Sequence, residues 1–196
     1  MAPADPTMSY YERNAAQFAH ATVDARMDEA LGAFAALLPA GARVLDWGCG
    51  SGRDSLALRE LGFEVTSVDG SPAMAEAALQ ATGTVVRVET FAQFAEVAAY
   101  DGIWACASLL HVPLAELPGV LDRAARALKP GAVLYCSFKY GTYEGLRNGR
   151  WFTDLQEEGL AQLLAPRFDV VRMWLSADVR PERGDERWLN CLATRR

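Results

Sequence analysis

The sequence has few of the residues that build metal centres or disulfide frameworks. Its 196 residues include two histidines and four cysteines, and Cys49, Cys106, Cys136 and Cys191 lie far apart with no C-x-x-C pair. Structural zinc sites and disulfide scaffolds need closely spaced ligands or thiols. We therefore expect neither a disulfide nor a bound metal.

Long apolar runs and an excess of basic residues are also missing. No run of 18 apolar residues occurs, and the N-terminal segment lacks the basic and apolar regions of a secretion signal, so we expect a cytoplasmic protein with no membrane span. The net charge of -6 disfavours general nucleic-acid binding, which needs a broad basic surface. A small molecule is the expected partner, and we expect a monomer or a homodimer.

The order of apolar patterns predicts one α/β domain spanning residues 1–196. Apolar residues at helical spacing between Ser9 and Leu38 predict two helices, broken near residues 20–24, which form an N-terminal helical cap over residues 1–40. Residues 41–196 then alternate seven β-rich runs with helical ones. This alternation predicts a doubly wound, mostly parallel sheet of seven strands.

The second half of the chain departs from simple alternation. We expect a helix from Leu114 to Leu128, a loop from Lys139 to Arg150 and a helix from about Thr153 to Leu164. The last two strands follow one another without a helix between them. They are predicted to form an antiparallel hairpin at the edge of the sheet or beside it.

The glycine-rich segment VLDWGCGSGRDS follows a predicted strand and opens a helix, as in nucleotide-binding proteins. A dinucleotide fingerprint that starts at Gly48 would need a small residue where Arg53 stands, which disfavours NAD. Asp46 would repel phosphates, but it suits a cationic ligand with an ammonium group and a sulfonium. Asp69 ends the next strand, where a carboxylate accepts both hydroxyls of a ribose. This pair of acids points to S-adenosylmethionine (SAM).

The same segments resemble those of a known enzyme class. DWGCGSG and VTSVDGS are similar to motifs I and II of class I SAM-dependent methyltransferases, DGIWACASLLH to motif IV, and LKPGAVL to the turn into the fifth strand. The resemblance covers nearly the whole chain and is greatest to small bacterial small-molecule methyltransferases of the tellurite-resistance type. It implies a Rossmann-like methyltransferase fold with an antiparallel C-terminal strand, N-terminal helices over the cofactor site, SAM as cofactor and S-adenosylhomocysteine (SAH) as product.

The resemblance also implies roles for single residues. Motif I frames the methionine part of SAM, Asp69 holds the ribose, and the residues that follow each of the next two strands flank the ribose and adenine. Met74 is either one of these flanking residues or plain helix core. The implied cofactor-binding residues are Asp46, Gly48, Cys49, Gly50, Arg53, Asp69, Gly70, Ser71, Met74, Thr90, Phe91, Cys106 and Tyr11.

Residues for the methyl acceptor are expected beyond the carboxyl ends of the strands. His111 follows the motif IV strand and is either a catalytic base or acceptor-orienting group, or a hydrogen-bonded structural histidine. The candidate substrate residues are Lys139, Arg150 and Arg180. A basic rim on an acidic protein suggests an anionic acceptor. The alternative is that these cations belong to a solvated charged loop and bind no substrate. Tyr11 either closes over SAM or belongs to an amphipathic helix core.

Several subclasses lack their defining motifs in this chain. Amino methylation of adenine or glutamine is associated with an Asn/Asp-Pro-Pro-aromatic pattern after the fourth strand, where this chain has Ala105 to Ser108. Cytosine C5 methylation needs a nucleophilic cysteine that usually follows a proline, and Cys106 does not follow one. We therefore predict an enzyme that methylates a small anionic or soft-nucleophile acceptor. The alternatives are a non-catalytic SAM-binding sensor or partner subunit and, less favoured, a NAD-dependent oxidoreductase.

Overall fold

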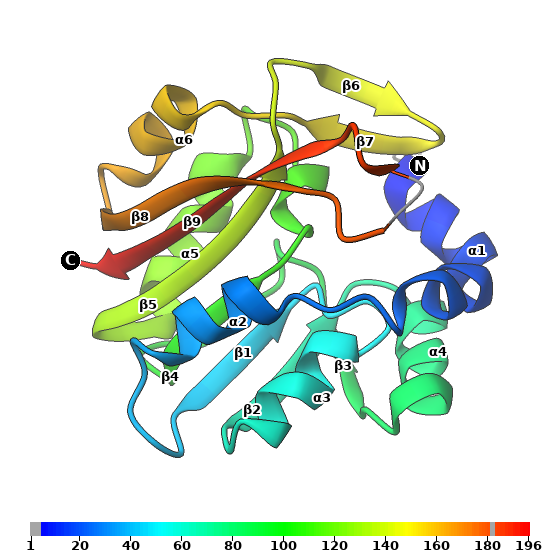
Figure 1. Ribbon diagram of the computed structural model, residues 1–196, viewed down its shortest axis with the longest axis horizontal. Coiled ribbons are helices and arrows are strands. Elements are labelled where there is room, and N and C mark those ends of the chain that lie inside the picture. Colours follow the sequence, from blue (N-terminus) through cyan, green and yellow to red (C-terminus); the bar gives the residue numbers. More distant parts are fainter. Residues whose placement is uncertain (1–4, 181–182) are drawn as a thin grey trace.

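A seven-stranded sheet forms the centre of the computed structural model, which describes residues 5–180 and 183–196 (Figure 1). The first four residues of the predicted cap and residues 181–182 of the predicted charged loop lie outside the described residues. The strands of the sheet are β1 (Arg43–Trp47), β2 (Glu64–Asp69), β3 (Val86–Val88), β4 (Tyr100–Ala105), β5 (Leu128–Lys139), β8 (Phe168–Ala177) and β9 (Arg187–Arg195).

The strand order across the sheet is β3-β2-β1-β4-β5-β9-β8. The first five strands pair in parallel, whereas β9 runs antiparallel to both β5 and β8. Strand β8 therefore has the direction of the first five, and β9 alone is reversed within this sheet. The predicted mostly parallel seven-stranded sheet with an antiparallel C-terminal strand is confirmed, as is the predicted hairpin at its edge.

Helices cover both faces of the sheet, as expected for a doubly wound fold. On one face Phe34 and Leu58 pack with Trp104, and on the other Leu121 and Leu160 pack with the side of the sheet that carries Leu134. All six side chains are almost completely buried. The helices are α1 (Pro6–Thr22), α2 (Asp28–Ala35), α3 (Arg53–Glu60), α4 (Pro72–Thr82), the 3-10 helix η1 (Leu109–His111), α5 (Leu117–Ala127) and α6 (Glu157–Leu164).

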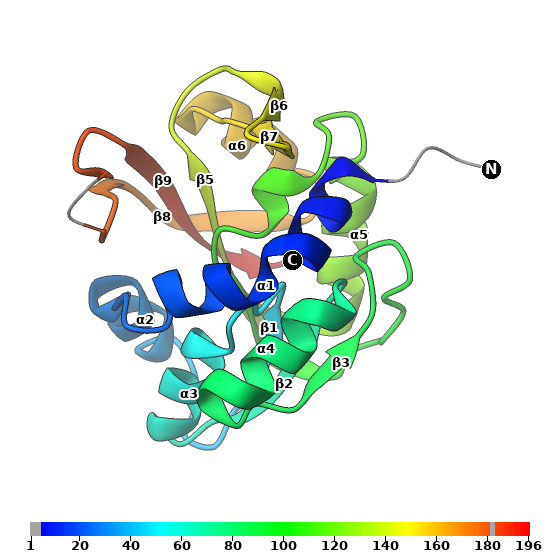
Figure 2. The same cartoon turned by 90° about the vertical axis from the view of Figure 1, so that its right-hand side faces the viewer.

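Helix α1 crosses the end of the sheet at which the parallel strands terminate (Figure 2). It begins after Asp5, whose side chain accepts hydrogen bonds from the backbone N–H groups of Thr7 and Met8, with Pro6 at its first position. Its small residues Ala15 and Ala19 pack against α4. The two predicted N-terminal helices are present, and the break between them follows residue 22.

The predicted loop from Lys139 to Arg150 is wrong in part, because it contains a β-hairpin outside the main sheet. Strands β6 (Glu144–Arg147) and β7 (Arg150–Thr153) pair antiparallel through a two-residue turn. Asn148 and Gly149 both have positive φ, of 51° and 79°, as a type I′ turn requires. The hairpin lies beside α1 (Figures 1 and 2).

Two predicted helices are shorter than expected. The segment from Leu114 becomes helical at Leu117, where Pro118 occupies the first turn, and the helix predicted from Thr153 begins at Glu157 because Thr153 belongs to β7. Across residues 5–180 and 183–196, no helix combines the length and the apolar character that crossing a membrane requires.

Candidate functional site

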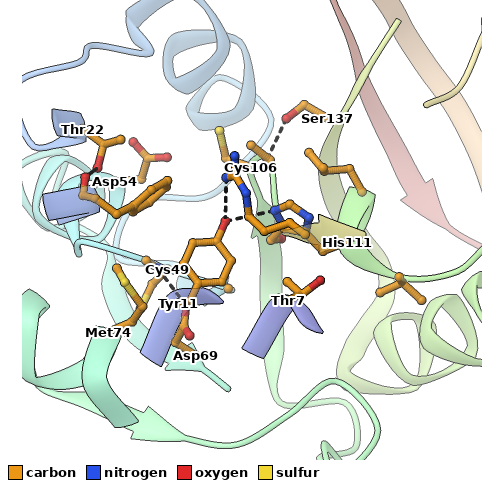
Figure 3. Close-up of a pocket in the computed structure, with 18 of the residues that line it drawn as sticks. Thr7, Tyr11, Thr22, Cys49, Asp54, Asp69, Met74, Cys106, His111 and Ser137 are labelled. Carbon is orange, nitrogen blue, oxygen red and sulfur yellow. Dashed lines mark hydrogen bonds between the residues drawn. The ribbon is translucent and has the colours of Figure 1, made fainter. Parts of the chain in front are cut away.

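A cavity of about 360 Å³ lies beyond the carboxyl ends of β1, β2, β4 and β5, within the usual size range of small-molecule sites (Figure 3). Helix α1 and the β6–β7 hairpin form its roof through Thr7, Tyr11, Arg150 and Phe152. The hairpin is tied to the helix, because the backbone N–H of Trp151 donates to Thr7 Oγ1 at 2.9 Å. Two segments far apart in the sequence therefore enclose one space.

The cavity brings together the predicted cofactor residues, with one exception. Ser71 does not line it but is fully buried as the N-cap of α4, where its hydroxyl accepts from the backbone N–H of Met74 and donates to Glu12. The predicted cofactor residues that line the cavity are Asp46, Gly48, Cys49, Gly50, Arg53, Asp69, Gly70, Met74, Thr90, Phe91, Cys106 and Tyr11. The predicted acceptor residues His111, Lys139, Arg150 and Arg180 line it too.

The loop after β1 is shaped by a glycine that no other residue can replace without displacement. Gly48 has a φ of +83°, and a Cβ there would lie 2.4 Å from Cβ of Ser108. Ser108 is itself fixed, since its hydroxyl donates to the carbonyl oxygen of Trp47 at 2.7 Å. The backbone of the loop thus forms a close-fitting floor to the cavity.

Asp69 is held in one orientation by the backbone around it. The N–H of Gly50 donates to one carboxylate oxygen at 3.0 Å, and the N–H of Ser71 donates to the other at 2.9 Å. Burial raises the pKa of Asp69 above its ordinary value, although these backbone hydrogen bonds act in the opposite direction. The side chain borders the cavity, with Tyr11 and Met74 nearby (Figure 3).

Asp46 is an acid whose charge depends on what occupies the cavity. The residue is 2% exposed, and the Ser55 hydroxyl donates to its carboxylate at 2.5 Å. Burial, followed by the nearby charge of Asp54, raises the pKa of Asp46 from 3.8 to about 7. A positively charged ligand beside it favours the ionised form, so the binding of a cation and the loss of a proton are linked at this carboxyl group.

Arg53 forms an ion pair with the buried Asp54 at the cavity wall. Its guanidinium donates to both carboxylate oxygens of Asp54, at 2.7 and 2.8 Å, and the indole N–H of Trp104 donates to the same carboxylate at 2.9 Å. Burial alone would raise the pKa of Asp54, but the charge and hydrogen bonds of Arg53 outweigh it and lower that pKa. Burial raises the pKa of the neighbouring Cys106 thiol, which makes it a poor nucleophile.

The hydrogen bonds around His111 connect three segments of the chain. Its Nδ1 lies 2.6 Å from the carbonyl oxygen of Trp151 in β7, and its Nε2 lies 3.0 Å from the Tyr11 hydroxyl of α1. Phe152 packs its ring edge against the imidazole, with 4.9 Å between the ring centroids. Burial lowers the pKa of His111 to about 4, a shift that the bond to Trp151 opposes and the charge of Arg150 supports.

Arg150 presents a guanidinium surrounded by aromatic rings. Its Cζ lies 4.5 Å from the ring centre of Tyr10 and 5.2 Å from that of Phe152, and one of its NH groups lies 3.5 Å from the Tyr11 hydroxyl. Its Nε is buried and has no hydrogen-bond partner. A buried donor without a partner is costly, so this group is suited to receive an acceptor atom from a ligand.

The other two predicted acceptor-site cations have carboxylate partners. Lys139 pairs with Glu186, and Arg180 donates two side-chain bonds to Asp178 at 2.8 and 2.6 Å. Burial lowers the pKa of Lys139 to about 8, and the bonds from Arg180 hold the pKa of Asp178 at about 2 against the effect of burial. Of the cavity-lining cations in the described chain, Arg150 alone lacks a carboxylate within ion-pair distance.

Sequence reasoning missed the contribution of the hairpin. Phe152 and the carbonyl of Trp151 line or border the site, and neither was a candidate because both fell between the predicted loop, which ended at Arg150, and the predicted helix from about Thr153. The Asn148-Gly149 pair between two apolar-containing runs is a hairpin signal that indicates this element. In the part of the chain that the structure describes, no group of three or more His, Cys, Asp or Glu residues is arranged to hold a metal ion.

Comparisons with known proteins agree with this architecture. A family model described as a methyltransferase domain matches residues 18–177. A ubiquinone biosynthesis O-methyltransferase from Xanthomonas axonopodis pv. citri is 36% identical over 110 residues, which are 53% of this chain and 45% of that protein. The chain thus spans less than half the length of this relative.

Solved structures of low sequence identity share the fold. The 1,6-didemethyltoxoflavin-N1-methyltransferase of Burkholderia thailandensis, solved with SAH and 1,6-didemethyltoxoflavin, gives a TM-score of 0.77 at 24% identity and covers 96% of this chain and 86% of that chain. A SAM-dependent methyltransferase from Methanosarcina mazei gives 0.71 at 21% identity, covering 81% and 94%. Because the family model spans most of its length, the chain belongs to this methyltransferase domain family, within the class I SAM-dependent methyltransferases.

Proposed function

We propose that the protein is an enzyme that transfers a methyl group from SAM to a small anionic acceptor. The observation that carries this proposal is the division of one cavity into two halves of opposite character. One half has the buried acids Asp46 and Asp69, and the other has the guanidinium of Arg150 with no carboxylate partner. A cationic cofactor and an anionic acceptor suit these two halves.

The residues of the first half fit SAM in size and in chemistry. Gly48 leaves room for a ligand where a side chain would collide with Ser108, and Asp69 presents a fixed carboxylate at the place expected for ribose. Asp46 matches the positive charge of the methionine part, while Met74 and Phe91 supply apolar surface for the adenine. SAM supplies the electrophilic methyl group, and the protein supplies alignment and exclusion of water.

The residues of the second half are proposed to hold the acceptor. Arg150 binds its anionic group, with Lys139 and Arg180 contributing to the positive character of the cavity mouth, and His111 orients the acceptor or accepts a proton. A carboxylate matches the planar fork of a guanidinium, and a chalcogen oxyanion of the tellurite-resistance type is the other candidate. We further propose that the enzyme works in the cytoplasm as a monomer or homodimer.

The cofactor half of the proposal is tested by calorimetry with SAH, SAM and NAD. We expect micromolar binding of SAH and SAM and none of NAD, with loss of binding in Asp69→Ala. The matched control is Asp28→Ala, which removes an exposed aspartate paired with Arg26 and should leave binding unchanged. Failure of the unmodified protein to bind either SAH or SAM would sink the proposal.

The acceptor half is tested by SAH release from SAM with a panel of small carboxylates and of selenium and tellurium oxyanions. We expect Arg150→Met to weaken acceptor use by at least about tenfold, the equivalent of one charge-assisted hydrogen bond, and to leave SAH affinity intact. Arg26→Met removes an exposed arginine and serves as control. SAM binding without transfer to any anion would favour the non-catalytic sensor instead.

A further inference from the structure

A phenol, an imidazole and a peptide carbonyl form a continuous hydrogen-bonded chain in the acceptor half of the cavity. Tyr11 extends from α1 with its hydroxyl directed at His111 (Figure 3). His111 in turn contacts the backbone carbonyl of Trp151 in the hairpin. Tyr11 and His111 both line the cavity. This series of hydrogen bonds therefore connects the Tyr11 hydroxyl, which borders the cavity, to the backbone carbonyl of Trp151.

The hydrogen bond between Nδ1 of His111 and the carbonyl oxygen of Trp151 fixes the tautomer of His111. A carbonyl oxygen only accepts hydrogen bonds, so the 2.6 Å contact with Trp151 places the ring proton on Nδ1. In the neutral ring Nε2 then carries no proton, and it accepts the hydrogen bond that the Tyr11 hydroxyl donates. The backbone of Trp151 is itself held by Thr7, so the imidazole has little freedom to turn over.

We propose that Tyr11 and His111 act as a proton relay for an acceptor whose nucleophile is a hydroxyl group. This inference rests on the methyltransferase function proposed above and narrows its substrate class to hydroxylated anions. The arrangement has the logic of a base oriented by a third group, with a carbonyl in the orienting position. Tyr11, placed from sequence among the cofactor residues, becomes the group that touches the acceptor.

The transfer of atoms is balanced without any additional reactant. The acceptor oxygen forms its new bond to the methyl carbon, the bond from that carbon to sulfur breaks, and its electron pair stays on sulfur. The hydroxyl proton passes to Tyr11 Oη as the Tyr11 proton passes to Nε2 of His111. Tyr11 ends neutral, His111 ends as an imidazolium that donates to Trp151, and the imidazolium returns its proton to water after the products leave.

The environment of the relay suits oxygen better than nitrogen. Because burial lowers the pKa of His111 to about 4, the imidazole is neutral and able to accept a proton throughout the physiological range. A hydroxyl that has just gained a methyl group is a far stronger acid than an imidazolium, so proton transfer to His111 is downhill. A methylated amine remains a weak acid, and its proton would not pass to so weak a base.

Charged and titratable groups from four elements face the relay. Arg150 of β7 and Lys139 of β5 lower the pKa of His111, while Asp69 of β2 and Tyr10 of α1 act on Tyr11, whose pKa is raised chiefly by burial. Arg150 is the nearest of these cations to Tyr11 Oη, at 3.5 Å. It stabilises negative charge on this oxygen as the two protons move, and it places an acceptor's anionic group beside the relay.

The first test needs no acceptor and uses nitrogen NMR of ring-labelled histidine in the SAH-bound protein. The chain has two histidines, so the variant His20→Gln leaves His111 as the single signal. We expect a proton on Nδ1, none on Nε2, and no titration between pH 8 and 6. The variant Tyr11→Phe should shift the Nε2 resonance, because it removes the hydrogen bond. A proton on Nε2, or titration near pH 7, would overturn the relay.

The second test compares two acceptors that differ in whether the nucleophile carries a proton. The probes are 3-hydroxybenzoate and 3-mercaptobenzoate at about pH 8, where the aromatic thiol is largely ionised and needs no base. Tyr11→Phe and His111→Gln should slow methylation of the hydroxyl by about 100-fold or more and methylation of the thiolate by less than about threefold. Equal losses for both probes would show that the pair only positions the acceptor, and would overturn the relay.

Controls separate failure of the relay from failure of the cofactor assignment. Tyr140→Phe removes the hydroxyl of an exposed tyrosine that does not line the cavity, and should slow neither probe. SAH calorimetry on each variant shows whether it has folded and keeps the cofactor site. SAH binding with the wrong tautomer refutes the relay alone, whereas no SAH binding refutes the proposed function. Where neither probe is methylated, the NMR result decides.

Discussion

Replacing Asp46 by asparagine should stabilise the ligand-free protein while weakening its binding of SAH. The carboxyl group is buried, and its pKa rises from 3.8 to about 7, so the native state holds a proton that the unfolded chain releases over this range. Stability conferred by a group with a raised acid pKa is lost as pH rises from its unfolded to its folded value. Asparagine has a similar shape and does not ionise, so its contribution to stability does not fall as pH rises.

The magnitude follows from the size of the pKa shift. A shift of about three units corresponds to roughly 4 kcal/mol above pH 7, and about 2 to 3 kcal/mol of this develops between pH 5 and pH 8. The stability of Asp46→Asn relative to the unmodified protein should therefore rise by about 2 to 3 kcal/mol over that interval. Urea unfolding at several pH values measures this difference, which is independent of any constant packing effect of the substitution.

The affinity for SAH should rise with pH, whereas the stability of the ligand-free protein falls with pH. With a pKa of about 7, roughly nine-tenths of Asp46 is ionised at pH 8 and one-tenth at pH 6, so SAH should bind about tenfold more weakly at pH 6. The Asp46→Asn variant should bind more weakly at pH 8 and show less dependence on pH. The reasoning is refuted if the stability difference stays constant from pH 5 to 8, or if the variant keeps the full pH dependence of SAH binding.

Two further substitutions test the floor and the wall of the cavity. Gly48→Ala should reduce SAH affinity by more than about tenfold in calorimetry, because the new Cβ meets Ser108. The control is Gly41→Ala, since Gly41 also has a positive φ but open space around it. This variant should cost about 1 kcal/mol of stability without loss of SAH binding. Asp54→Ala should lower the free energy of unfolding by about 2 to 4 kcal/mol, because it leaves the partly buried charge of Arg53 and the indole N–H of Trp104 without a partner. A loss below about 1 kcal/mol in urea unfolding would contradict the importance of this pair.

The sequence allowed the fold to be predicted because its signals are local and repeated. The first five strands contain β-rich runs that are separated by turns and helices, and the order of strands and helices limits the possible topologies. The acids of the cofactor half lie at the ends of β1 and β2 and the glycines follow these strands, so the positions of both are set by the strands. The sequence therefore assigns Asp46 and Asp69 to the same ligand, and both line one cavity.

The acceptor half was harder to predict because it depends on contacts between distant segments. Tyr11 and His111 are 100 positions apart, and nothing near either residue indicates that their side chains meet. The pairing of Lys139 with Glu186 and of Arg180 with Asp178 likewise depends on how the last loop folds back. Only the structure distinguishes Arg150 from these two cations, because composition treats all three alike.

The hairpin of β6 and β7 suggests how such a protein can acquire new substrates. It lies outside the seven-stranded sheet, yet it contributes Arg150, the carbonyl that holds His111 and the ring of Phe152. Most of the proposed cofactor residues belong to the ends of the sheet's strands and to the segments that directly follow them. Exchange of this short insertion between related enzymes would alter acceptor choice while leaving cofactor affinity and the folding core intact, provided that its bond to Thr7 is preserved.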